Sequence, residues 1–216
     1  MYRLITLLCL SILPLAMGET NTAGQFNQVF QLPDKTFFEN LHVLPDGKLL
    51  LSTFRTGNLL ILDPAAANPV PSKVASLEGI NGLTGIAPLE NNVYAVTAGK
   101  NEYFSFIKGS MKLFVVSLDS GVLDAISVPD RQMLNGMAAL PHEPHTILSA
   151  DSIEGRIFRI NTKNQKVGVA ITDYALGPGT SSFKMGANGL KLRGDYLYFA
   201  NSVQGTFKRR VASRQY

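Results

Sequence analysis

The sequence predicts an all-β protein, a β-propeller built of four-stranded antiparallel blades. Four glycines, spaced 52, 46 and 50 residues apart, each begin a short, largely apolar stretch that leads to a polar residue. Beyond the first residues, no segment shows the sustained 3.6-residue apolar period of an amphipathic helix. A repeat near fifty residues in a strand-rich chain is typical of propeller blades. The four glycines are Gly57, Gly109, Gly155 and Gly205.

Each repeat also has a landmark upstream of its glycine. In the first, the strand 39–44 leads through the turn Pro45-Asp46-Gly47 into the apolar strand 48–52. Proline, asparagine, aspartate and glycine in these turns supply the backbone angles that tight turns require. The second strands are apolar on both faces, which is expected where blades stack face to face. The corresponding strand pairs in the later repeats are 83–89 with 93–96, 134–140 with 146–151, and 187–192 with 196–201.

These repeats define one domain. We expect residues 1–18 to form a signal peptide, 19–207 an incomplete propeller with about four blades, and 208–216 a basic tail that matches no blade. The fourth repeat loses its pattern where Arg210 replaces the apolar Ile160 of the third. An incomplete larger ring is therefore favoured over a closed four-bladed ring, and 25–32 is a candidate extra strand.

The first residues have the pattern of a secretory signal. A short basic start precedes the apolar run 4–15, and small residues at 16–18 offer a cleavage site. A membrane anchor or a buried first helix is the alternative. Cys9, the only cysteine, lies inside this signal, so the mature chain would have no thiol or disulfide chemistry. We expect a secreted or secretory-pathway protein with no membrane span after cleavage.

Composition and charge narrow the function classes. Hydrophobic residues make up 45% and charged residues 17% of the 216 residues, which excludes a disordered chain. The net charge is +4, and part of the surplus lies in the last nine residues. Nucleic-acid binding would need basic residues interleaved with stacking aromatics, and these are absent from the sequence. We expect a monomer that does not bind nucleic acid.

Several segments, taken in their order and spacing, resemble one known group. The chain is similar to the secreted fungal branch of six-bladed propellers related to gluconolactonase and senescence marker protein, over nearly all of the mature chain to about Phe207. Members of that branch are generally longer, so the resemblance implies a truncated member. The segments are 39–41 with 45–47, 83–87, 134–137, 150–152 with 155–157, and 188–190 with 196–201.

The resemblance implies two activities. Lactonases of the wider family hydrolyse sugar lactones with one divalent metal at the ring centre. Some fungal members resemble hetero-Diels–Alderases, which join a reactive polyketide to a terpene. Fold analogy alone does not choose between them.

The same resemblance implies three metal ligands: Glu39, Asn135 and Asn188. Asn188 stands where the family pattern has an aspartate, which leaves one carboxylate and two amides. Because calcium affinity rises with the number of carboxylates, this set predicts a weak site and lacks the general base of a hydrolase. The structural alternative is that the asparagines tie down strand starts by hydrogen bonds to the backbone.

Other residues offer further candidates. Asp151 is either catalytic or the cap of a strand end, and the structural role is favoured. The segment 101–108 inserts Tyr103, Phe104 and Phe106 between two strands. These aromatics either form a small core under the loop or an apolar wall that binds a hydrophobic, polycyclic substrate.

We therefore hypothesise a pericyclase-like enzyme of secondary metabolism. It would couple a reactive polyketide with a terpenoid in a (hetero-)Diels–Alder reaction, by confinement in an apolar pocket. No cofactor is expected to be required, and a weakly bound calcium ion is the alternative. A calcium-dependent lactonase-type hydrolase and a non-enzymatic or inactive truncated binding propeller remain the competing functions.

Overall fold

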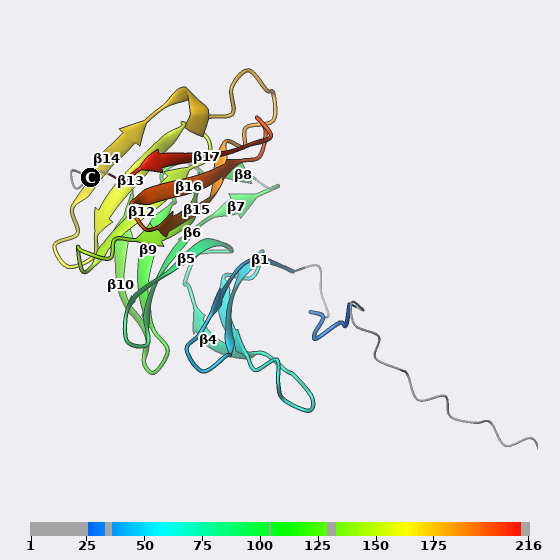
Figure 1. Cartoon of the computed structure of the whole chain (residues 1–216). Helices are drawn as coiled ribbons and strands as arrows, with labels where there is room; N and C mark the ends of the chain where they lie inside the picture. Colours follow the sequence, from blue (N-terminus) through cyan, green and yellow to red (C-terminus); the bar gives the residue numbers. More distant parts are fainter. Residues whose placement is uncertain (1–25, 33–35, 104, 129–132, 213–216) are drawn as a thin grey trace, which may run out of the picture.

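The computed structural model describes residues 26–32, 36–103, 105–128 and 133–212. The strands between Phe37 and Val211 form four antiparallel blades (Figure 1). The predicted signal peptide 1–18, Phe104 and the end of the tail, 213–216, lie outside the described residues. Blade 1 comprises β1 (Phe37–Val43), β2 (Leu49–Phe54), β3 (Asn58–Leu62) and β4 (Ser72–Ser76). Blade 2 comprises β5 (Gly82–Glu90), β6 (Val93–Gly99), β9 (Lys112–Ser117) and β10 (Gly121–Ser127).

The third and fourth blades follow the same plan. Blade 3 comprises β11 (Leu134–Ala139), β12 (Thr146–Asp151), β13 (Arg156–Asn161) and β14 (Val167–Thr172). Blade 4, within the described residues, comprises β15 (Ala187–Arg193), β16 (Tyr196–Asn201) and β17 (Thr206–Val211). The short hairpin β7 (Asn101–Glu102) and β8 (Ser105–Phe106) and the 3-10 turn η1 (Tyr174–Leu176) lie between blade strands. The predicted all-β propeller fold of about four blades is confirmed.

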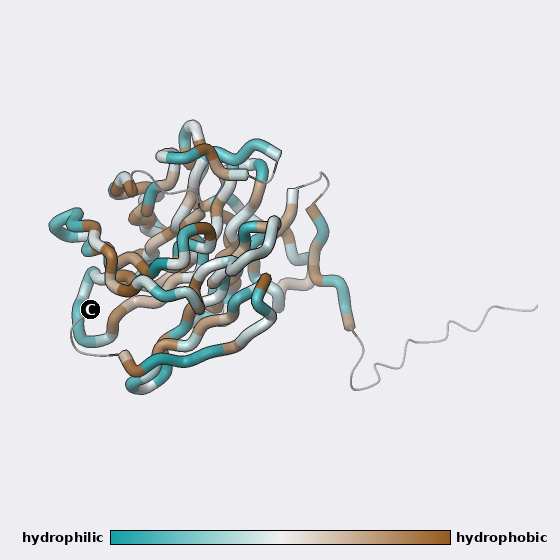
Figure 2. Tube along the Cα trace, turned by 90° about the horizontal axis from the view of Figure 1, so that it is seen from above, coloured by the Kyte–Doolittle hydropathy of each residue, from teal (hydrophilic) through white to brown (hydrophobic). Residues whose placement is uncertain are grey.

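Consecutive strands within each blade pair with one another, so every blade is an antiparallel meander. One residue pair, Phe54 with Gly82, also pairs a strand of blade 1 with a strand of blade 2. This pairing joins the two blades into one eight-stranded sheet. Figure 2 shows hydrophilic residues concentrated in the outer loops. Apolar side chains of the strands pack between neighbouring blades, for example Leu59 and Val96 between blades 1 and 2 and Leu148 and Leu197 between blades 3 and 4.

The four landmark glycines share one backbone conformation. Gly57, Gly109, Gly155 and Gly205 have φ between 61° and 79°, in the left-handed region that favours glycine. Each lies at the turn before the third blade strand, and at Gly57 an added Cβ would lie 2.1 Å from the Ile80 carbonyl oxygen. The fifty-residue repeat therefore follows from a turn that only glycine adopts without strain.

The first strands of the blades, β1, β5, β11 and β15, lie next to one another and are called the inner strands here. Each contains a β-bulge at an equivalent position, where one extra residue interrupts the register with the second strand. A bulge bends its strand and redirects the extra side chain. The bulges contain Glu39, Thr84-Gly85, Asn135-Gly136 and Asn188-Gly189.

The glycines of these bulges permit close contact between blades. A Cβ added to Gly85 would lie 2.2 Å from the Asn135 carbonyl oxygen, and one added to Gly136 would lie 2.1 Å from that of Asn188. Real Cβ atoms do not approach oxygen so closely, so a side chain there would push the next blade away. Gly189 repeats the motif, but nothing lies within 4 Å of its Cβ position.

Two parts of the chain differ from the sequence expectation. The predicted extra strand at 25–32 is wrong within its described part, because 26–32 form no strand. Phe30 and Leu32 instead pack on the face of blade 1 that points away from blade 2, beside Leu51 and Leu60. At the other end, β17 continues through Lys208–Val211, beyond the expected boundary at Phe207. Main-chain pairing with β16 forms this strand in full register and does not require apolar side chains.

Among the described residues no helix has the length and apolar character needed to cross a bilayer.

The close contact at Gly136 predicts a specific sensitivity. Replacing Gly136 with alanine should lower the free energy of unfolding by about 1–3 kcal/mol, because the new methyl group overlaps the β15 backbone. Gly189→Ala is the matched control: the motif is the same, the space is open, and the change should stay within about 0.5 kcal/mol. Urea unfolding of both variants measures the difference, and equal losses would contradict this account of blade packing.

Candidate functional site

The inner-strand bulges bring two of the three predicted metal ligands together. Glu39 on β1 is half-buried, and Asn135 on β11 is almost fully buried, with 1% of its surface exposed. Burial raises the pKa of the Glu39 carboxyl, and the neighbouring Asn135 amide partly offsets this rise. The Asn135 Nδ2 nonetheless has no hydrogen bond of ordinary geometry within the described structure. An amide donor is therefore available close to a carboxyl group whose pKa burial raises.

The third predicted ligand, Asn188, has a side-chain contact within its own blade. The Asn188 Nδ2 lies 3.4 Å from Ser202 Oγ, so its amide is engaged with the end of β16 in its own blade. The three predicted ligands together would offer a cation one carboxylate and two amide oxygens. The described residues contain no group of three His, Cys, Asp or Glu side chains arranged to hold a metal ion. This donor set fits a hydrolytic metal centre poorly.

Thr84, at the equivalent bulge of β5, was not singled out from the sequence. Its hydroxyl is fully buried and donates to the Leu134 carbonyl oxygen at 2.6 Å, which links blade 2 to blade 3 beside Asn135. Thr97 Oγ1 accepts the Gly85 N–H at 2.9 Å and holds the bulge in place. The signal was present, because Thr84-Gly85 occupies the same place in its repeat as Asn135-Gly136 and Asn188-Gly189.

His42 lies further along β1 from Glu39. Its ring packs edge-on against the Tyr94 ring at 5.4 Å between centroids. Burial lowers the pKa of His42, and the positive charge of Lys191 on β15 lowers it further. Both effects favour the neutral imidazole of His42.

Asp151 serves as a turn cap, in agreement with the favoured structural interpretation. Its Oδ1 accepts the backbone N–H groups of Ile153 and Glu154 at 3.0 and 3.2 Å. Asn201 occupies the equivalent position in blade 4, where its Oδ1 accepts the Gln204 N–H at 3.0 Å. Since an asparagine performs the same task one blade later, this cap does not depend on a negative charge.

Tyr103 and Phe106, the two described residues of the predicted aromatic wall, lie in different environments. Tyr103 is 98% exposed at the tip of the β7–β8 hairpin, whereas Phe106 is 6% exposed and belongs to the core. The Phe106 ring packs edge-on against Phe54 at 5.6 Å between centroids. The structure does not bring Tyr103 and Phe106 together, and the place of Phe106 fits the small-core alternative.

An apolar pocket instead adjoins Glu39. It has a volume of about 460 Å³ and lies on the face of blade 1 that points away from blade 2. This volume is within the range of small-molecule sites, which are apolar with few polar groups. Glu39 is the one ionisable side chain among its lining residues. They are Gln28, Val29, Phe30, Phe38, Glu39, Asn40, Leu41, Leu49, Leu51 and Leu62.

Two fungal proteins are similar in sequence. The "Putative hetero-Diels-Alderase" of Phoma sp is 27% identical over 205 residues, covering 79% of this chain. The "Putative hetero-Diels-Alderase asR5" of Sarocladium schorii is 23% identical over 211 residues, covering 85%. The chain is similar to these fungal proteins over most of its own length. It spans about half of their length, 56% and 53%, and no protein-family model matches it.

Solved structures agree with the fold. The WD40 repeats of RRP9 superpose with a TM-score of 0.57 at 12% identity, covering 82% of this chain and 51% of that one. Regucalcin, a calcium-binding protein from Agrobacterium tumefaciens, gives a TM-score of 0.55 at 17% identity, covering 78% and 55%. At these identities the likeness establishes the propeller fold alone. Together with the fungal relatives, it confirms the family resemblance predicted from the sequence.

The two described aromatics predict opposite mutational outcomes. Phe106→Ala should lower the free energy of unfolding by about 3–5 kcal/mol, because it leaves a cavity beside Phe54. Tyr103→Ala should change it by less than about 0.5 kcal/mol, because the ring lies in solvent. Thermal or urea unfolding of both variants tests this, and a stable Phe106→Ala protein would return Phe106 to the list of pocket residues.

Proposed function

We propose that this chain contributes to a cyclase that catalyses hetero-Diels–Alder coupling in the pocket beside Glu39. An oxygen-containing heterodiene, such as a quinone methide derived from a polyketide, reacts with the alkene of a terpenoid. One C–C and one C–O bond form as the π electrons reorganise, and no atom, proton or leaving group is lost. The observation that carries the proposal is an apolar pocket with one carboxyl group, whose pKa is raised, in a relative of proteins named as hetero-Diels-Alderases.

Confinement supplies the main effect. Two apolar reactants leave water for the leucine and phenylalanine side chains of the pocket, such as Phe38, Leu41 and Leu51. Holding both partners in reacting geometry contributes up to roughly 7–11 kcal/mol of the barrier. A pericyclic reaction needs no nucleophile. Its principal requirement is that both reactants are held in reacting geometry, which such a pocket can provide.

Glu39 adds electrophilic assistance. In its neutral form the carboxyl group donates a hydrogen bond to the heterodiene oxygen, where negative charge develops during C–C bond formation. Burial raises the pKa of Glu39 and so extends the pH range over which the proton is present. We assign Asn135 a positioning role, because its buried amide lies close enough to Glu39 to affect the pKa of the carboxyl group.

This mechanism predicts a distinctive set of Glu39 variants. Glu39→Ala should lower the rate about 10²-fold, the order found when one transition-state donor is removed. Glu39→Gln should retain most of the rate, because its amide still donates. Wild-type activity should fall as pH rises through the raised pKa of Glu39, whereas the Gln variant should be insensitive to pH there.

The measurement is the rate and enantiomeric excess of coupling between a quinone methide generated in situ and an excess of alkene. Glu90→Gln is the control, because Glu90 is an exposed carboxylate at the end of β5. Equal rates for wild type and Glu39→Ala would exclude Glu39 from catalysis.

A calcium-dependent lactonase-type activity is the second candidate, because Glu39 and Asn135, two of its implied ligands, lie together. The cyclase mechanism requires no cofactor. We also propose that the chain enters the secretory pathway. Calcium, compared with a chelator, should leave the unfolding temperature unchanged if the cyclase proposal holds. A calcium-dependent rise that disappears in Glu39→Gln would favour the hydrolase.

A further inference from the structure

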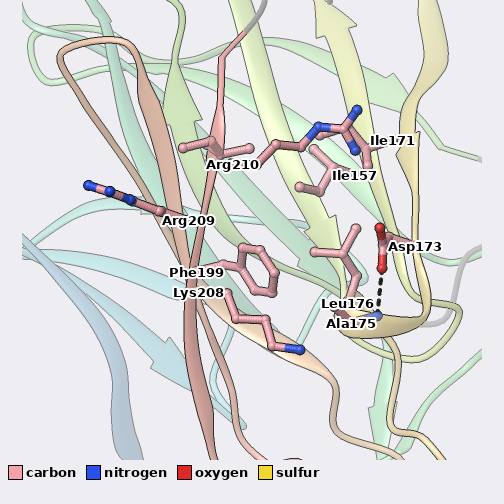
Figure 3. A pocket seen from close by; sticks show the side chains of 10 residues that line it. Ile157, Ile171, Asp173, Ala175, Leu176, Phe199, Lys208, Arg209 and Arg210 are labelled. Atoms are coloured by element: carbon pink, nitrogen blue, oxygen red, sulfur yellow. Dashed lines mark hydrogen bonds between the residues drawn. The ribbon is translucent and has the colours of Figure 1, made fainter.

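A second pocket lies between blades 3 and 4, remote in sequence from Glu39. It has a volume of about 280 Å³, and β17 forms one of its walls opposite β14 and η1 (Figure 3). In Figure 1 the red β17 lies on the same side of the molecule as β13 and β14. The floor is formed by the apolar residues of both blades, Ile157, Ile171, Leu176, Leu197 and Phe199, all of which are buried.

Two cations face this floor. Strand residues alternate between faces, so Lys208 and Arg210 share one face of β17 and Arg209 takes the other. Figure 3 shows Lys208 and Arg210 extending toward the blade 3 side and Arg209 pointing away. The Arg209 guanidinium lies over the Tyr196 ring, 4.5 Å from its centroid, on the opposite face. Arg209 is also among the residues that line the pocket, but its guanidinium lies over Tyr196 and points away from the floor that Lys208 and Arg210 face.

The pocket cations have no anionic partner in the described part of the chain. No ion pair joins Lys208 or Arg210 to any described carboxylate. Asp173, the acidic residue of the pocket, caps η1, where its Oδ1 accepts the Ala175 N–H at 2.8 Å (Figure 3). Two cations therefore face one carboxylate that already has a structural role.

We propose that this pocket binds an amphipathic organic anion, with a flat apolar body on the Leu197–Phe199 floor and a carboxylate between Lys208 and Arg210. Burial of the apolar body provides the driving force, and the cations select the charge. A neutral ligand of the same shape loses the charge-assisted hydrogen bonds. The pocket beside Glu39 offers no cation among its lining residues and does not favour a carboxylate, so the two sites are chemically distinct.

The test uses 2-naphthoate as the probe and the neutral alcohol 2-naphthalenemethanol, which has the same ring system, as its control. Affinities are measured by calorimetry on the full chain. Naphthoate should bind at one site, at least tenfold more tightly than the alcohol. The Lys208→Gln/Arg210→Gln double variant should weaken naphthoate binding at least tenfold and leave alcohol binding within twofold.

Arg209→Gln is the matched control, because it removes the same charge from the same strand but from the opposite face. It should change naphthoate affinity by less than threefold. If the control and the double variant lose naphthoate affinity equally, the effect is one of general surface charge and the proposed site is wrong. Equal affinity for naphthoate and the alcohol would also overturn it.

The folding of the variants is checked independently. Lys208→Arg/Arg210→Lys keeps both charges and should retain naphthoate affinity within threefold. If this charge-conserving variant loses binding as fully as the double glutamine variant while its unfolding midpoint is unchanged, the assigned role of the two charges is wrong. An acidic extended peptide that displaces naphthoate and pairs with β17 would assign the pocket to strand addition instead.

Discussion

The fold depends on backbone-to-backbone contact between the inner strands of neighbouring blades. Gly85 and Gly136 lack the side chain that would hold the next blade away, so the carbonyl oxygens of Asn135 and Asn188 come close to them. Buried hydroxyl groups complete the contact: Ser52 donates to the Thr84 carbonyl at 3.0 Å, and Ser152 donates to that of Ala187 at 2.6 Å. Blade stacking thus satisfies polar groups that would otherwise be costly to bury.

The bulges that permit this contact also create the candidate site. One extra residue in each inner strand redirects Glu39 and Asn135, which lie on blades that are not neighbours. A half-buried carboxyl group next to a buried amide without a full set of hydrogen bonds is unusual in a region that serves packing alone. Such a feature, next to an apolar pocket, is what a hydrogen-bond donor for a confined reaction requires.

The sequence predicted the features that repeat from blade to blade. It did not predict features set by the direction of a single hairpin or by main-chain pairing. The left-handed turns at Gly57 and its equivalents have a physical need for glycine, so the blade period was visible. Phe106 and Tyr103 are separated because the hairpin turns at Tyr103, where φ is 50°, and no period indicates that direction. The strand at Lys208–Val211 was missed because main-chain pairing, which leaves no apolar pattern, forms it. The resemblance suggested Glu39 and Asn135, but only the bulges explain why they meet.

The most direct test of this account is the pKa of Glu39, measured by carbon-13 NMR titration of its side-chain carboxyl group in the wild type and in Asn135→Leu. Burial should hold the wild-type pKa above the ordinary value for glutamate. Removing the Asn135 amide should raise it further, because that amide favours the charged form. A wild-type pKa at or below the ordinary value, or one that Asn135→Leu leaves unchanged, would contradict the pairing of Glu39 with Asn135.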